Sequence, residues 1–194
     1  MPQAKINSIT AIERLIEPEL GAGRLLPAAL ATAACRGGGA SARMVVLRGL
    51  DAKLMEVWFS TDARSLKLAD LAAVPEGELC VWLHRVRVQV RLRCRWRIIG
   101  GGVTSGRDRT RWLAAWGEHS AHARRLFAGP MPGRPYARSS KAMQTIAGQP
   151  PLESFAVCVG RVLQIDALVL GRPQHQRYVH QRVARGWRSQ RVNP

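Results

Sequence analysis

The sequence predicts a mainly β domain with helical additions, arranged as an antiparallel barrel. Three observations support this fold class. Residues 85–98 alternate strictly between apolar and polar side chains, which is typical of a long strand with one buried face. Several shorter apolar segments lie between glycine- or proline-containing turns. Segments with helical periodicity are few and mostly short, so the strands are expected to form most of the structure.

The chain is expected to form one domain over residues 1–194, because 194 residues with 46% hydrophobic side chains can bury a sizeable core. An amphipathic helix is predicted at about 8–20, since Ile12, Leu15, Ile16 and Leu20 recur at helical spacing. The first twenty residues also lack the apolar core of a signal peptide, so we expect a cytoplasmic protein.

The next elements are predicted from short apolar segments and the residues between them. Residues 28–35 and 42–48 flank a glycine turn and predict a β-hairpin. Residues 54–60 predict another strand. Thr61 or Asp62 is then expected to cap a helix that continues to about residue 73.

The second half of the chain begins with an apolar strand at 79–84 and the long alternating strand at 85–98. The polar face of the long strand carries Arg85, Arg87, Gln89, Arg91, Arg93, Arg95 and Arg97. Like charges in a row repel, so this face needs water, acidic partners or a bound anion. The remaining predicted elements are helices at 108–117 and 120–128, an ordered surface loop at 129–151, strands at 155–166 and 167–170 joined at a bend, and a basic tail at 172–194.

The chain is strongly basic, with 30 Lys and Arg against 13 Asp and Glu and a formal net charge of +17. Such a charge attracts phosphates of any kind, including nucleic acids and anionic cofactors. An arginine-rich genome explains the overall excess without any ligand. The four cysteines are isolated and the histidines lack metal-ligand spacing, so reduced thiols and no metal site are expected.

Two short segments predict a phosphate-binding site. The first, residues 43–48, is an apolar run with Arg43 and Arg48 at its ends. The second, residues 59–67, ends a strand in hydroxyls and cations where a helix is expected to begin. Hydroxyls, free N–H groups at a helix N-terminus and nearby cations together can hold a phosphate monoester. Each segment also has a purely structural interpretation, as a buried strand with exposed arginine ends and as an ordinary first helical turn.

Four motifs in order resemble the pyridoxamine 5′-phosphate oxidase family and its relatives with an FMN-binding split barrel. They are Arg43-Met-Val-Val-Leu-Arg48, Ser60-Thr61 followed by Arg64-Ser65-x-Lys67, Gln89-Val-Arg91 and His175-Gln-Arg177. The resemblance extends from about residue 28 to Trp187. It implies an antiparallel six-stranded split barrel and a closer likeness to an oxidase-related subgroup with a Thr-Asp-Ala-Arg-Ser-x-Lys segment, which reads here as Thr61–Lys67.

The resemblance implies FMN as the cofactor and a role for each matching residue. The flavin ring and ribityl chain would be contacted by Arg43, Met44, Val45, Val46, Arg48, Gln89 and Arg177. The FMN phosphate would be held by Ser60, Thr61, Arg64, Ser65 and Lys67. Arg48, His175 and Arg177 are the candidates for a catalytic role, although His175 has no neighbouring carboxylate in the sequence to orient it.

The family also implies a homodimer with the flavin at the subunit interface. The implied activity is hydride transfer from a small substrate, with a phosphorylated amine among the candidates, to flavin N5 and then to oxygen or another acceptor. The family's substrate-phosphate residues are not matched in 112–140 or at Pro173-Gln-His175, so the sequence leaves the substrate open. Two alternatives stay open as well: a basic barrel that binds nucleic acid, and an FMN-binding protein without turnover.

Overall fold

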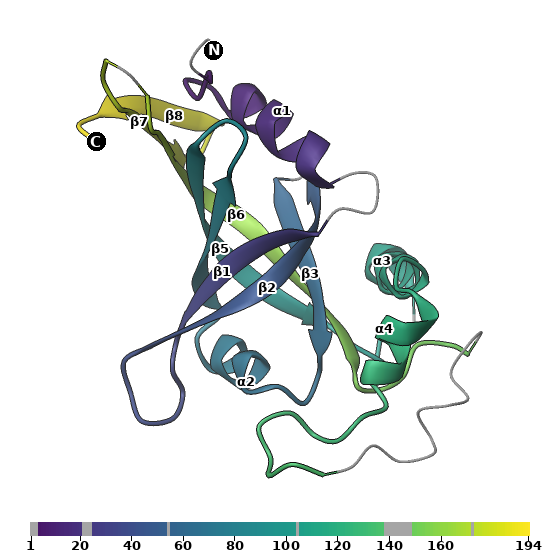
Figure 1. The fold of residues 1–194 in the computed structure, drawn as a ribbon. Coiled ribbons are helices and arrows are strands. Elements are labelled where there is room, and N and C mark those ends of the chain that lie inside the picture. Colours follow the sequence, from purple (N-terminus) through teal and green to yellow (C-terminus); the bar gives the residue numbers. More distant parts are fainter. Residues whose placement is uncertain (1–3, 21–24, 54, 104, 138–148, 172) are drawn as a thin grey trace.

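The computed structural model describes residues 4–20, 25–53, 55–103, 105–137, 149–171 and 173–194 (Figure 1). Its strands are β1 (Leu26–Ala33), β2 (Ala40–Asp51), β3 (Glu56–Asp62), β4 (Glu76–Leu83), β5 (Val88–Ile99), β6 (Phe155–Val169), β7 (Gln176–Arg182) and β8 (Trp187–Val192). Its helices are α1 (Ile9–Leu20), α2 (Leu66–Ala73), α3 (Gly106–Gly117) and α4 (Ala121–Leu126).

Six of these strands form a closed antiparallel barrel. The strand order is β3-β2-β1-β4-β5-β6-β7-β8, and an additional pairing between β3 and β6 closes the ring. The N-terminal part of β6, Phe155–Arg161, pairs with β3, whereas its C-terminal part, Gln164–Val169, pairs with β7. The sheet therefore divides along β6, and the β7–β8 hairpin extends beyond the barrel. The fold class predicted from the sequence is confirmed.

The barrel interior is filled by the inward residues of every strand. Phe59 packs edge to face against Trp96 with ring centroids 5.3 Å apart, and both are buried. The Trp96 ring also covers Gly160, where an added Cβ would lie 2.8 Å from the ring. A side chain at position 160 would therefore displace the tryptophan from the core.

The helices cover the two ends and one side of the barrel (Figure 1). Ile12 and Ile16 of α1 are buried at the end near β7 and β8, and Leu68 and Leu71 of α2 are buried at the opposite end. Helices α3 and α4 lie beside the region where β3 and β6 meet, over a second apolar cluster that includes Trp116. No helix among the described residues is long and apolar enough to cross a membrane.

The predicted strand over 85–98 was wrong at its N-terminal end. Residues 84–87 form the turn between β4 and β5, and Arg87 has a positive φ of 53°. The alternating pattern continues through this turn, so periodicity alone could not show where the chain reverses. Arg85 and Arg87 therefore lie in the turn and not on the strand face.

Two other predictions also differ from the structure. Asp62 still belongs to β3 because it pairs with Phe155, so the cap of α2 is Ser65 and not Thr61 or Asp62. The two predicted strands at 155–166 and 167–170 are one strand, β6, whose register shifts opposite Arg93 and Cys94.

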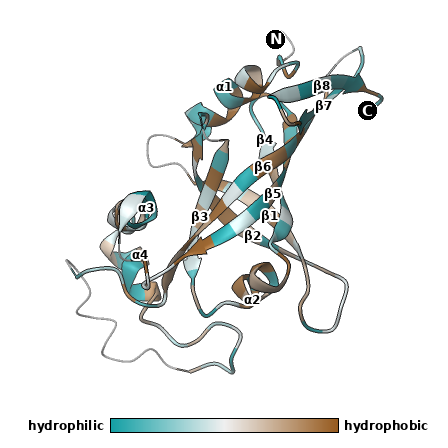
Figure 2. Cartoon of the chain, turned by 180° about the vertical axis from the view of Figure 1, so that it is seen from behind, coloured by the Kyte–Doolittle hydropathy of each residue, from teal (hydrophilic) through white to brown (hydrophobic). Residues whose placement is uncertain are grey.

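The basic tail predicted at 172–194 contains the β7–β8 hairpin, whose β8 strand is largely hydrophilic (Figure 2). Part of the predicted 129–151 loop, residues 138–148, lies outside the described residues, as does Leu54 at the start of the predicted 54–60 strand.

Candidate functional site

The turn between β3 and α2 is held by an aspartate and an arginine two residues apart. The Asp62 carboxylate accepts hydrogen bonds from the Arg64 backbone N–H at 2.8 Å and from the Arg64 guanidinium at 2.9 and 2.6 Å. The same guanidinium donates to the carbonyl oxygens of Phe127 and Gly129. Arg64 therefore connects this turn to the segment after α4, and most of its donors are already used.

Two serine hydroxyls near this turn are buried and have no hydrogen-bond partner in the part of the chain that the structure describes. Ser65, at the N-cap of α2, is 8% exposed, and its side chain makes no capping bond to the helix. Ser60 lies on β3, and its Oγ is likewise buried and unpaired. Buried polar atoms are nearly always hydrogen-bonded, so two orphaned hydroxyls beside a helix N-terminus indicate a missing ligand.

Lys67, in the first turn of α2, places its ammonium group in the same region. Its Nζ donates to Thr61 Oγ1 at 2.9 Å. Burial lowers the pKa of the Lys67 ammonium, with a contribution from the nearby Arg43 charge. An anion bound beside this half-buried ammonium group would stabilise its charged form, because the anion would offset the cost of desolvation.

Arg43 reaches the same end of the barrel from β2. Its guanidinium donates to Asp70 at 2.8 Å and to the hydroxyls of Thr32 and Ser41 at 2.6 Å each. The hydrogen bond from the Cys35 backbone N–H, helped by bonds from Thr32 and Arg43, lowers the pKa of the Asp70 carboxyl to about 2. Burial alone would raise that pKa. Asp70 thus fastens α2 to the ends of β1 and β2 and orients Arg43.

Of these groups, Arg43, Lys67 and Asp70 line a cavity of about 400 Å³, here called the α2 cavity, and Ser65 directly precedes its lining residue Leu66. Its lining residues are Ala34, Cys35, Arg36, Ser41, Ala42, Arg43, Leu66, Lys67, Asp70, Pro132 and Gly133. Three of its four charged residues are cations. The combination of cations, orphaned hydroxyls and a helix N-terminus fits a phosphate group.

The predicted residues on β2 divide between the two faces of the strand. Val45 is buried in the barrel core, whereas Met44 is 64% exposed on the opposite face. The pairing of β2 with β3 is irregular between Leu47 and Gly49, which leaves Arg48 at a bulge. Bulges redirect side chains and are common beside functional sites.

Arg48 lines a second cavity of about 670 Å³, here called the Arg48 cavity. Its lining residues are Leu20, Leu25, Leu47, Arg48, Glu118, His119, Ser120 and Ala123. It lies where β2, the end of α1 and the α3–α4 junction meet. Arg48 makes no ion pair with the described part of the chain.

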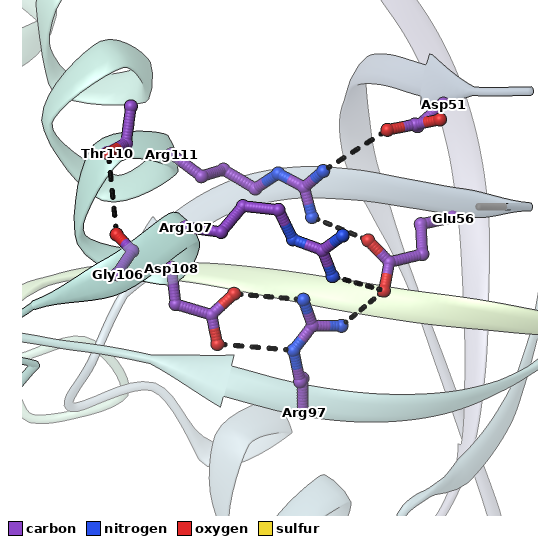
Figure 3. Close-up of polar contacts among 8 residues, drawn as sticks. All are labelled: Asp51, Glu56, Arg97, Gly106, Arg107, Asp108, Thr110 and Arg111. Carbon is purple, nitrogen blue, oxygen red and sulfur yellow. Dashed lines mark hydrogen bonds and ion pairs between the residues drawn. The ribbon is translucent and has the colours of Figure 1, made fainter. Parts of the chain in front are cut away.

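Helix α3, which leads to this junction, is attached to the barrel by an ion-pair network (Figure 3). The buried Glu56 carboxylate accepts from Arg97 at 2.8 Å and from Arg111 at 2.7 Å, and Arg107 lies 3.8 Å away. Burial alone would raise the pKa of the Glu56 carboxyl, but the bonds from Arg111 and Arg97 more than offset it and lower that pKa.

The Arg111 guanidinium also stacks on the Trp58 ring, 4.7 Å from its centroid. That ring covers Gly49, where an added Cβ would lie 1.9 Å from a ring atom. The contact requires glycine at position 49, next to the bulge at Arg48. The Trp58 ring therefore contacts both Arg111 of the α3 network and Gly49 beside the bulge.

Gln89 and Arg177 lie in one row across the sheet, because Leu168 of β6 pairs with both. The Arg177 guanidinium donates to the buried Asp166 carboxylate at 3.0 and 2.8 Å, and Arg91 donates to the same carboxylate. The structure thus brings these two predicted residues to one face of the barrel, separate from the α2 cavity.

His175 lies outside both this arrangement and the α2 cavity. It is exposed in the loop before β7 and lines a shallow region with the C-terminal residues Gln190–Pro194. The sequence did not predict Asp70, Asp166 or His119. The aspartates act through arginines that are distant in sequence, and His119 carries no motif, so only the folded chain reveals them.

The fold and these contacts define a class of protein: a closed antiparallel barrel with a cavity lined mainly by cations at one end. Comparison with known proteins then shows which family the chain resembles. Residues 9–100 match the family model described as pyridoxamine 5′-phosphate oxidase, FMN-binding domain. The pyridoxine/pyridoxamine 5′-phosphate oxidase 2 of Arabidopsis thaliana is 28% identical over 162 residues, which cover 79% of this chain and 80% of that protein.

Solved structures agree. A pyridoxamine 5′-phosphate oxidase-related, FMN-binding protein from Nostoc punctiforme superposes with a TM-score of 0.80 at 25% identity, covering 99% of this chain and 100% of that one. PhzG from Burkholderia lata shares the fold, with a TM-score of 0.75 at 16% identity over 96% of this chain and 92% of that one. The chain is therefore similar in sequence and fold to pyridoxamine 5′-phosphate oxidase-related split-barrel proteins, and the family domain that it matches over residues 9–100 is an FMN-binding one.

Proposed function

We propose that this protein is an FMN-dependent oxidoreductase that accepts a hydride from a small organic substrate. The observation that carries the proposal is the buried, unpaired Ser65 hydroxyl at the N-terminus of α2 beside the desolvated Lys67. Together they form a preformed anion site on a barrel whose family binds FMN.

The FMN phosphate is proposed to bind in the α2 cavity. Ser65 would donate its hydroxyl hydrogen, and Lys67 and Arg43 would supply positive charge. Thr61 would orient the Lys67 ammonium, to which it is already hydrogen-bonded. Arg64 has a supporting role in this proposal, because its guanidinium is engaged by Asp62 and two carbonyl oxygens.

The rest of the cofactor is proposed to extend along the outer face of the barrel. Met44 and Val46 would contact the ribityl chain and ring, with Val45 contributing only its backbone, since its side chain is in the core. Gln89 and Arg177 would bind polar atoms at the flavin edge. Ser60, whose hydroxyl is unpaired on β3, would donate a further hydrogen bond.

The bound FMN supplies the redox chemistry, taking a hydride at N5 and passing the electrons to oxygen or another acceptor. The residues of the chain hold the cofactor, exclude water and orient the substrate. Arg48 is the proposed substrate-facing cation, because it is close to the β2 cofactor residues and is not paired within the described chain.

The protein is also proposed to be a homodimer. Met44 and Trp82 are large apolar residues, 64% and 43% exposed, on strands that belong to the same barrel wall. Exposed apolar side chains of this size on a rigid sheet are typical of an interface. Light scattering during gel filtration should give the mass of two chains, and a monomer would contradict this part of the proposal.

The arginine-rich face of β5 gives less support to nucleic-acid binding than the sequence suggested. Arg91 pairs with Asp166 and Glu78, Arg93 pairs with Glu76, and Arg97 pairs with Glu56 and Asp108. Arginines paired in this way are less available to phosphates.

The first experiment measures cofactor binding at the α2 cavity. Apoprotein is titrated with FMN and with riboflavin, which lacks the phosphate, and quenching of flavin fluorescence reports binding. Replacing Ser65 by Ala and Lys67 by Met together should weaken FMN binding about 100-fold, because two or more charge-assisted contacts are lost. Riboflavin affinity should change little.

The exposed Lys53 provides a matched control, since Lys53→Met removes the same charge away from the cavity. The proposal fails if the double variant binds FMN as tightly as the unaltered protein. Oxygen-dependent turnover of any amine, alcohol or reduced ring compound would separate an oxidoreductase from an FMN carrier.

A further inference from the structure

The Arg48 cavity has the size and lining of a site for a small organic molecule. Its volume of about 670 Å³ lies in the range of ligand pockets. Leu20, Leu25 and Leu47 give it an apolar wall, and its polar residues come from the β2 bulge and the α3–α4 junction. This combination of an apolar wall and a few polar groups is typical of sites that orient a small organic molecule.

His119 is the residue of this cavity whose bonding is incomplete. It is 9% exposed, and both of its ring nitrogens are buried without a hydrogen-bond partner among the described residues. Its ring is fixed by edge contacts with Phe127 and Phe155, whose centroids lie 5.5 and 5.6 Å away. A fixed imidazole with two unpaired nitrogens is costly unless a ligand supplies a partner.

The imidazole of His119 is neutral at physiological pH. Burial, and then the charges of Arg48 and Arg124, lower the pKa of His119 to about 4. It therefore offers one N–H donor and one nitrogen acceptor, and adds no positive charge to the cavity.

Two of the other polar groups around the cavity, Arg124 and Ser120, already make hydrogen bonds within the chain. The remaining two, Arg48 and Glu118, carry opposite charges. Arg124 donates to the carbonyl oxygens of Trp116 and Gly117 and stacks on the Trp116 ring. Ser120 Oγ accepts a bond from the Ala123 N–H as the N-cap of α4. Arg48 is the cation that lines the cavity, and Glu118 is its carboxylate.

This charge balance differs from that of the α2 cavity. A phosphate monoester carries close to two negative charges at neutral pH and is bound by several cations and N–H groups. The α2 cavity has Arg36, Arg43 and Lys67, whereas the Arg48 cavity is lined by one cation, Arg48, and one carboxylate, Glu118. A single guanidinium matches a single carboxylate, which it can bind through two parallel hydrogen bonds.

We propose that the Arg48 cavity binds an aromatic monocarboxylate and discriminates against phosphate esters. Arg48 pairs with the carboxylate, the leucines contact the ring, and the neutral His119 bonds to a hydroxyl or ring nitrogen of the ligand. The inference rests on the proposed function, since it names the substrate class of the same flavoprotein, and it identifies His119 as a determinant of specificity.

The test uses three ligands that share one ring and differ in charge: pyridoxine, 4-pyridoxate and pyridoxine 5′-phosphate. Each is titrated into the FMN-loaded protein by calorimetry, with the flavin absorption spectrum recorded in parallel. The carboxylate should bind at least tenfold more tightly than the phosphate ester and should shift the flavin spectrum. Cofactor content is measured on the same samples, so loss of FMN, which would contradict the proposed function, is recognised separately.

His119→Phe tests the role of the imidazole, because phenylalanine preserves the aromatic packing and removes both nitrogens. It should weaken 4-pyridoxate binding about tenfold and leave FMN affinity unchanged. His122→Phe is the matched control, since His122 is exposed on α4 and does not line the cavity. Tighter binding of the phosphate ester, absence of carboxylate binding, or equal binding by His119→Phe and unaltered protein would each overturn the proposal.

Discussion

The α2 cavity and the Arg48 cavity lie along the same barrel but are built in different ways. The α2 cavity takes Leu66 and Lys67 from one short segment, adds Arg43 and is strongly basic. The Arg48 cavity collects residues from β2, the end of α1 and the α3–α4 junction, and its charges balance. We propose the first as the site of the cofactor phosphate and the second as the site of the substrate.

The two cavities differ in how much of their lining a contiguous stretch of sequence encodes. A helix N-terminus with hydroxyls and a lysine is a local arrangement, so a contiguous motif encodes it. A cavity between three segments that are distant in sequence depends on how α3 packs, so no contiguous motif predicts it. Substitutions around one cavity therefore test whether ligand binding or stability at the other cavity changes.

The largest effect is expected from Glu56→Gln in the network that attaches α3. The substitution leaves Arg97 and Arg111 beside an uncharged group in a buried setting, so the free energy of unfolding should fall by about 3 kcal/mol. Urea denaturation measures it. Asp108→Asn is the control, because the Asp108 side chain is 36% exposed and its loss should cost less than about 1 kcal/mol.

Glu56→Gln also tests whether the two cavities are independent. If α3 positions only the Arg48 cavity, the ratio of FMN to riboflavin affinity should not change, since that ratio reports the phosphate contacts alone. A large change in the ratio would mean that the α3 network also shapes the α2 cavity.

A smaller effect is expected from Asp70→Asn at the α2 cavity, about 2 kcal/mol of stability. The folded-state pKa of Asp70 is about 2, below its ordinary value of 3.8. Its contribution is therefore present above about pH 4 and is lost as the pH falls toward 2. Denaturation curves of the two proteins should converge over that interval, and a constant difference would contradict the assignment.

The smallest effect is expected from His119 in the Arg48 cavity. Its pKa is lowered to about 4 in the folded protein, so the unfolded chain takes up the proton first as the pH falls. Stability should decline by about 1 kcal/mol between roughly pH 6.5 and 5.5, and His119→Phe should remove this decline. His122→Phe should keep it. An unchanged slope in His119→Phe would show that other groups cause the decline.

Much of the barrel could be predicted from local sequence patterns. The apolar runs gave most of the strands to within a few residues, because the side chains that face the core alternate along them. The turn at 84–87 was missed since alternation continues through Arg85 and Arg87. The β7–β8 hairpin was missed because its strands are rich in polar residues and owe their pairing to β6.

The site divides in the same way. Arg43, Ser65 and Lys67 were predicted, and the structure brings them to one end of the barrel. Whether they hold the cofactor stays a prediction. The partners that orient them, above all Asp70, were not foreseen, because an aspartate in an ordinary helix has no distinguishing sequence context. His119 is neutral and fixed in place only because the fold buries it beside Phe127 and Phe155.

The ring of strands has a consequence for biosynthesis. Its last seam, between β3 and β6, joins residues about a hundred positions apart, and His180 near the C-terminus bonds to the Ile6 carbonyl. The first contact can form only after β6 has been synthesised, and the second only after β7. The nascent chain must therefore keep several apolar strands unpaired until these two strands emerge, and we expect it to depend on chaperones during that interval.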